Sequence, residues 1–185
     1  MKEPTTDTQA GPNRNIRRIV QYGVAVAASI VLLFLIIGVY KFYTLSPEKL
    51  YNEIYTPYES SAAPDDNASP IEKAWREKKY GAVINLNKTS VLSVKDVFLT
   101  GMSFLETYDY SRAISSLQVV IAEAKDNKSQ LKDTAEYYLA LAFLRNRDYD
   151  QAIELMNAIR NNSSHHYKDK FSRKFINRVK RLKWR

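Results

Sequence analysis

From residue 70 to the end of the chain, apolar residues recur every three or four positions, with almost no Gly or Pro between them. That spacing is the period of an α-helix, and no stretch alternates apolar and polar residues as a half-buried strand would. Breaks in the pattern fall at clusters of Asp, Asn, Ser and Lys, such as "KDNKSQ" and "RNNSSHH". The pattern predicts an all-α fold, with helices over residues 70–79, 81–88, 93–107, 110–125, 131–146, 149–160 and 167–184.

Residues 19–40 show a different pattern, 22 positions without a charged side chain. At ~1.5 Å per residue a helix of this length is roughly 33 Å long, which suffices to cross a bilayer core of about 30 Å. The run continues into "KFYTL", without the small-residue cleavage site of a secretory signal peptide. We therefore expect a single transmembrane helix over residues 16–43, in contact with the lipid bilayer through residues 19–40.

The flanks of this span predict its orientation. Arg14, Arg17 and Arg18 precede it, whereas Lys41 and Lys49 are the only basic residues close behind it. The positive-inside rule then keeps the N-terminus in the cytoplasm and exports everything after the span.

Polar segments lie on both sides of the span. Residues 1–15 have no apolar periodicity and read as a disordered cytoplasmic tail. Residues 46–69 begin with "SPEKLYNEIY", where Ser46 is a candidate helix cap and Pro47 suits the first helical position. We expect a short juxtamembrane helix there, followed by a linker through "ESSAAPDDNASP".

Two stretches of the helical region nearly repeat each other. "DYSRAISSLQ" begins at Asp109 and "DYDQAIELMN" at Asp148, and each opens the second helix of an expected helix pair. Within each pair, small residues stand at spacings that let two helices approach closely, while large residues fill the space beside them. Because one such pair leaves an apolar face uncovered, neighbouring pairs should stack on it.

This arrangement resembles the tetratricopeptide repeat family over roughly residues 70–165. A degenerate earlier copy, around "AWREKKYGAVI", has Tyr80 and Val83 in the Tyr and Ala positions. The three Tyr positions are 30 and then 39 residues apart instead of the family's 34, and no copy has the family's Trp or terminal Pro. The signature positions are matched by Gly101, Phe104, Tyr110, Ala113 and Leu117 in one copy and by Ala140, Phe143, Tyr149, Ala152 and Met156 in the next.

The resemblance implies a short helical-hairpin solenoid over residues 70–166 that binds protein. In the family, the first helix of each pair lines a concave groove, although the carboxylate-clamp pattern that holds chaperone tails is not evident here. The groove could instead be filled by the juxtamembrane segment or by the last helix of the same chain. The expected groove residues are Trp75, Arg76, Phe98, Met102, Glu106, Tyr137, Leu141 and Arg145.

The layout of a short tail, one anchor and degenerate repeats is similar to membrane-anchored repeat proteins of Bacteroidetes-type bacteria. In architecture alone it also resembles the single-span repeat subunit that accompanies the bacterial Sec translocon. These likenesses imply a scaffold or accessory factor of the cell envelope with protein partners there. They imply a single-pass protein of the bacterial inner membrane, with its N-terminus cytoplasmic and its C-terminal domain periplasmic.

Composition adds one further feature, the charge of residues 167–185. This segment holds nine Lys and Arg against one Asp, so it carries +8, the net charge of the whole chain. We expect a basic amphipathic helix that caps the last repeat with an apolar face. That face consists of Phe171, Phe175, Ile176, Val179 and Leu182.

The same helix carries the alternative function, a surface-binding protein that docks on anionic lipid or another polyanion. Nucleic acid is a weaker candidate for that polyanion if the domain is exported. The basic residues concerned are Arg173, Lys174, Arg178, Lys180, Arg181 and Lys183.

Catalytic constellations are sparse. The chain has no Cys, and no nucleotide-binding, zinc-protease or nucleophile-elbow motif occurs. His165 and His166 are its only histidines, and their adjacency prevents them from pairing across one helix face. We expect no enzyme, no cofactor and no metal site.

Overall fold

The computed structural model describes residues 14–59, 68–87, 92–124 and 130–184, and every regular element within these ranges is helical. The expected all-α fold is confirmed. Most of the predicted tail and linker, and the insertion "KDNKS" at 125–129, lie outside the described residues. The chain divides into two compact units, residues 1–44 and 45–185.

The described part of the first unit is one long helix, α1 (Arg14–Tyr43), followed by Thr44. Its stretch Gln21–Tyr40 is long and apolar enough to cross a membrane. The apolar side chains of this stretch are uncovered, and Phe34, for example, is 70 % exposed. A core helix of a soluble domain would bury such side chains, so the exposure argues against that alternative.

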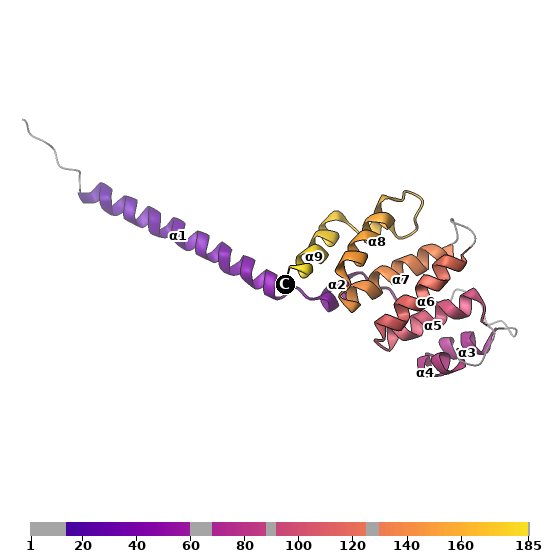
Figure 1. The fold of residues 1–185 in the computed structure, drawn as a ribbon. Coiled ribbons are helices and arrows are strands. Elements are labelled where there is room, and N and C mark those ends of the chain that lie inside the picture. Colours follow the sequence, from indigo (N-terminus) through magenta and orange to yellow (C-terminus); the bar gives the residue numbers. More distant parts are fainter. Residues whose placement is uncertain (1–13, 60–67, 88–91, 125–129, 185) are drawn as a thin grey trace, which may run out of the picture. The chain divides into compact units, whose positions relative to one another are not determined.

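The second unit is built on three helical hairpins. Within each hairpin the two helices pack against each other, and each hairpin also packs on the next (Figure 1). This packing of consecutive helices is that of a solenoid. The hairpins are α3 (Pro70–Arg76) with α4 (Tyr80–Leu86), α5 (Val94–Glu106) with α6 (Tyr110–Glu123), and α7 (Gln130–Asn146) with α8 (Tyr149–Asn161).

The three hairpins share one turn geometry. Lys78, Tyr108 and Arg147 have left-handed backbones, with φ of 55°, 64° and 67°, and each stands two positions before the Tyr that opens the next helix. In every turn the residue after the left-handed one donates its N–H to a carbonyl five positions back, at 2.8 to 2.9 Å. The degenerate first copy therefore has the same turn as the other two hairpins.

The small residues of the pattern lie where the helices of a hairpin meet. A Cβ added to Gly101 of α5 would come within 3.1 Å of the Ser116 Cβ on α6, so a larger residue here would require α6 to shift by a few tenths of an ångström. Ala113, Ala140 and Ala152 are completely buried. The small residues that recur in the sequence are therefore those at which the helices of a hairpin pack closely.

The last segment differs from the single helix predicted over residues 167–184. A 3-10 turn, η1 (Lys168–Lys170), precedes α9 (Arg173–Lys183), and the chain bends between them at Phe171, whose ring is completely buried. Ser172 caps α9 by accepting the Phe175 N–H at 3.2 Å. The predicted helix was therefore wrong at its start. Phe171 fits the helical spacing of the apolar residues, but the backbone around it is not α-helical.

The rest of the segment caps the stack as predicted. α9 packs on α8 and on α2 (Pro47–Ile54) and leaves its basic residues outside. Its inner face is buried and consists of Phe175, Ile176, Val179 and Leu182.

Candidate functional site

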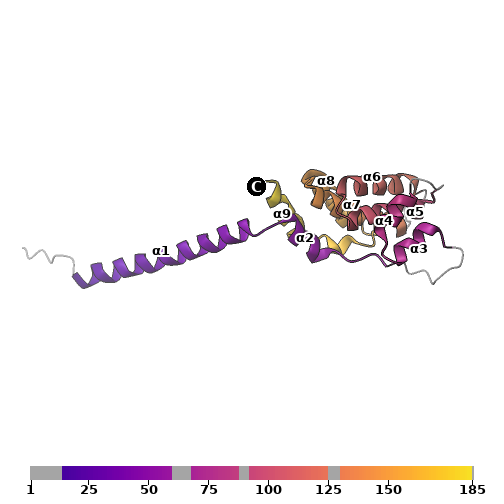
Figure 2. The same cartoon turned by 90° about the horizontal axis from the view of Figure 1, so that it is seen from below.

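A segment of the chain itself lies against the helices that line the predicted groove. We call residues 45–59 the strap. It begins with α2, capped by Ser46 with Pro47 at the first position as predicted, and continues as an extended segment from Tyr55. α2 packs on α7 and α9, and Figure 2 shows it beside α9. Its Leu50 is completely buried.

Hydrogen bonds hold the strap by two backbone carbonyls, one at the last residue of α2 and one in the extended part. The Tyr138 hydroxyl donates to the carbonyl of Thr56 at 2.7 Å, and the Tyr137 hydroxyl donates to the carbonyl of Ile54. Both tyrosines belong to α7, the first helix of the last hairpin. The two hydroxyls thus fix where α2 ends and where the extended segment begins on α7.

Aromatic contacts hold the side chains of the strap. Tyr51 and Tyr55 stack with their ring centroids 4.7 Å apart, and the Arg145 guanidinium lies 5.4 Å from the Tyr51 ring. Tyr58 meets Phe98 of α5 edge to face at 4.8 Å. Such aromatic and cation–π pairs stabilise a contact beyond the area that they bury.

Five of the eight predicted groove residues contact the strap, and they are Trp75, Phe98, Glu106, Tyr137 and Arg145. Phe98, Met102, Tyr137 and Leu141 are completely buried, and Trp75 is nearly so. Arg76, Glu106 and Arg145 are half-buried. The structure brings all eight onto the first helices α3, α5 and α7, but most of their surface is occupied from within the chain.

The covering changes the electrostatics of the tyrosines. Burial raises the pKa of Tyr137 from 10.0 to about 12. Burial also raises the pKa of Tyr51, Tyr55 and Tyr138, and for Tyr55 the hydrogen bond that its hydroxyl donates to the Glu106 carboxylate raises it further. A phenolate would be poorly solvated in this contact, so the strap is held by neutral phenols.

An open recess of about 450 Å³ remains beside the strap, between residues 55–59 and the α3–α5 region. Its walls combine aromatic rings with charges of both signs, which is the composition of a binding recess with a few polar contacts. A second recess of about 460 Å³ lies between residues 56–59 and α7. The first recess includes Tyr55, Tyr58, Trp75, Arg76, Tyr80 and Glu106 among its lining residues.

The predicted basic residues of the last helix divide into two groups. Arg178 pairs with Glu53 of the strap at 2.7 Å, and Lys183 pairs with Asp150 of α8 at 2.6 Å. These two cations help to fix α9 on its neighbours. The other four are exposed and are Arg173, Lys174, Lys180 and Arg181.

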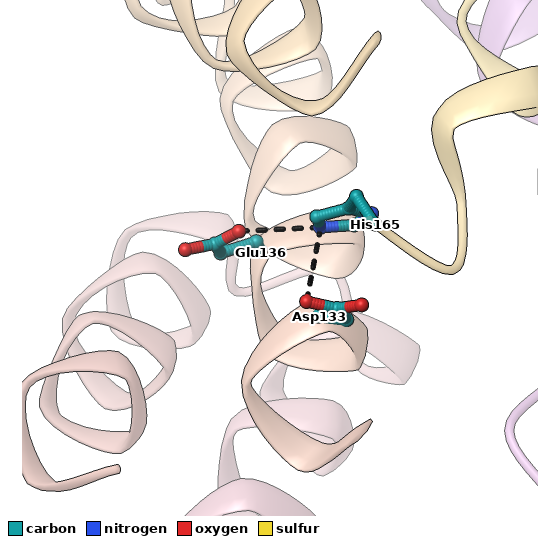
Figure 3. Close-up of side chains that lie close together, drawn as sticks. All are labelled: Asp133, Glu136 and His165. Carbon is teal, nitrogen blue, oxygen red and sulfur yellow. Dashed lines mark hydrogen bonds and ion pairs between the residues drawn. The ribbon is translucent and has the colours of Figure 1, made fainter. Parts of the chain in front are cut away.

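One polar cluster was not predicted from the sequence. Asp133 and Glu136, about one turn apart on α7, face His165 from the loop after α8 (Figure 3). His165 is 2 % exposed, and its Nε2 lies 3.2 Å from the Glu136 carboxylate and 3.7 Å from that of Asp133. An imidazole and two carboxylates so close together form a donor set that could hold a metal ion.

The hydrogen bond at the second ring nitrogen, Nδ1, favours a structural role of His165 over metal binding. The Tyr167 N–H donates to His165 Nδ1 at 3.0 Å, and a neutral imidazole that accepts at Nδ1 carries its proton on Nε2. Nε2 then donates to Glu136 and has no lone pair for a metal. Asp133 in turn accepts the His166 N–H at 2.8 Å. The cluster fastens the loop after α8 to α7.

Comparison with known proteins gives one family match, and it lies in the last hairpin and the loop after it. Residues 134–165 match the tetratricopeptide repeat family, and this match contains all five signature positions of the second quoted repeat. The chain thus carries a tetratricopeptide repeat, the module of a family that is typically non-catalytic and binds proteins. A search of curated proteins and a search of solved structures found no match to this chain.

Proposed function

We propose that this chain is a membrane-anchored tetratricopeptide-type scaffold, an accessory or assembly factor of the bacterial cell envelope, that binds a protein partner in its concave groove. The observation that carries the proposal is the strap. The groove holds the extended segment by the backbone carbonyl of Thr56 and by the aromatic contact of Tyr58 with Phe98, and peptide-binding grooves use contacts of these two kinds.

The open recess is where a partner segment would bind beside the strap. The half-buried Tyr80 offers aromatic surface, backed by the nearly buried ring of Trp75 at 5.2 Å between ring centroids. Arg76 and Glu106 offer one charge of each sign. A volume of about 450 Å³ suits one or two side chains of a peptide. Aromatic and Arg side chains in such positions supply most of the binding energy in protein interfaces.

Site-specific photo-crosslinking tests the recess. A photoreactive residue replacing the half-buried Tyr80 of the full chain, in membranes of the host cell, is expected to give adducts of one or two defined masses. The same residue replacing Val119, which is 48 % exposed on α6, is the matched control and should give none. Equal adducts from both positions, or none from position 80, would count against a partner in the recess.

The anchoring and its orientation belong to the same proposal. In this proposal α1 crosses the inner membrane, with the N-terminus in the cytoplasm and residues 41–185 in the periplasm. The apolar stretch of α1 and the arginines before it support this orientation. On intact spheroplasts, added protease should therefore degrade the repeats. Protection of the repeats until the membrane is permeabilised would indicate the opposite orientation and a cytoplasmic set of partners.

A further inference from the structure

The outward face of α9 is entirely basic or neutral and ends in an exposed indole. At 100° per residue, this face lies directly opposite the buried apolar face of the helix. α9 contains no Asp or Glu. Trp184, at the end of the helix, is 83 % exposed. The outward face consists of Arg173, Lys174, Asn177, Lys180, Arg181 and Trp184.

The charges of this face are not needed to hold the fold. Arg178 and Lys183, the two cations with carboxylate partners, lie at the edges of the buried face. Within the described part of the chain, the four cations of the outward face have no ion pair. Residues 1–166 carry equal numbers of basic and acidic side chains. A helix that only capped the repeats could have the same balance on its outward face.

The fold brings this face close to the beginning of the repeat unit. α9 packs on α2, with Arg178 bound to Glu53, although the two residues are 125 positions apart. In the sequence α2 begins at Pro47, only four positions after the last residue of α1. Four residues span at most about 14 Å, so the length of the chain keeps α2 near the surface of any bilayer that α1 crosses.

We infer that the outward face of α9 docks on the anionic lipid headgroups of the membrane that holds α1, an inference that rests on the anchoring proposed above. Lys and Arg near a negatively charged leaflet gain electrostatic attraction, and an indole favours the headgroup region. The short connection to the anchor adds a high effective concentration, so a small set of charges suffices. The buried face of α9 stays in the repeat unit when the outer face binds.

The test uses the full chain in lipid nanodiscs. Because the chain has no Cys, a fluorophore can be placed at one position through Asn177→Cys, in the middle of the outward face, with Val119→Cys on α6 as the control. Quenching by lipids that carry a spin label below the headgroup reports contact with the membrane. Discs of phosphatidylcholine alone are compared with discs that also contain phosphatidylglycerol.

We expect the label at position 177 to be quenched in the anionic discs and not in the neutral ones. The ratio of docked to undocked chain should fall about tenfold or more in the variant R173Q/K174Q/K180Q/R181Q, and also at high salt. The label at position 119 should report no contact in any disc. Unchanged melting of the variant in detergent shows that the fold is intact.

The outcomes separate this inference from the anchoring on which it rests. If the chain does not co-migrate with the discs, the anchoring fails. If the chain is incorporated but the label at position 177 is quenched equally in neutral and anionic discs, or equally in the charge variant, the docking is wrong. Salt-sensitive binding of a single-stranded oligonucleotide without quenching in anionic discs would assign the face to nucleic acid instead.

Discussion

Raising the pH from about 9 to about 12 is expected to unfold the repeat unit, because the strap contact depends on neutral phenols. The folded state raises the pKa of Tyr137 to about 12 and raises those of Tyr51, Tyr55, Tyr58 and Tyr138. Above the ordinary value of 10.0 the unfolded chain loses these protons while the folded chain keeps them. Stability is therefore complete below about pH 10 and falls as the pH rises through the folded pKa values.

The effect should be large. For the completely buried Tyr137, two pKa units correspond to roughly 3 kcal/mol, and the other four tyrosines add to it. Far-ultraviolet circular dichroism should be lost together with the part of the tyrosinate absorbance that belongs to these five tyrosines, because their hydroxyls ionise as the fold opens. Full titration of all 13 tyrosines with native helical content would contradict the burial of these hydroxyls.

Tyr137→Phe is the informative variant for this alkaline transition. It removes the hydrogen bond to the Ile54 carbonyl and should cost about 1 kcal/mol near neutral pH. It also removes one buried titrating group, so its urea midpoint should fall less than that of the wild type between pH 8 and 11, approximately. Tyr108→Phe, at a residue that is 74 % exposed, should behave as the wild type.

Phe175→Ala is expected to lower the melting temperature of the repeat unit by roughly 6–20 °C. Phe175 is 3 % exposed in the interface between α9 and the repeats, and loss of a buried Phe costs about 3–5 kcal/mol. For a unit of this size, each kcal/mol corresponds to roughly 2–4 °C. Thermal melts of a soluble fragment of residues 45–185, which has its own core, would measure the change.

The matched control for this variant changes only the outward face of α9. Arg173, Lys174, Lys180 and Arg181 are exposed, so replacing all four by Gln should shift the unfolding free energy by about 1 kcal/mol or less. If deletion of residues 167–185 left the melting temperature untouched, α9 would be a free arm and not a cap.

The helices of the repeats could be predicted because their information is local. The 3.6-residue period, and the repeated Tyr and Ala positions, lie within single hairpins. The start of the last segment could not be placed this way, because Phe171 and Phe175 are four apart and fit an unbroken helix. Only the Ser172 cap marks the true start of α9.

The strap contact could not be derived from the sequence, because its information is not local. Residues 55–59 have no helical period, and the tyrosines that hold Ile54 and Thr56 come 83 and 82 positions later. The spacing of Tyr51, Tyr55 and Tyr58 was the available sign that this segment binds an aromatic surface. The pairing of His165 with α7 was hidden for the same reason, since its partner Glu136 is 29 positions away.

The strap also determines the order in which the contacts of the repeat unit can form during translation. Glu53 is synthesised 125 residues before its partner Arg178, which at about 5–20 residues per second is a wait of roughly 6–25 s. Leu50 and the strap tyrosines emerge directly behind the first apolar helix, before the helices that later bury them. The contacts of the strap with α7 can form first, and those of α2 with α9 can form only after the last helix has emerged, so a chain stalled before α9 would lack the Glu53–Arg178 pair.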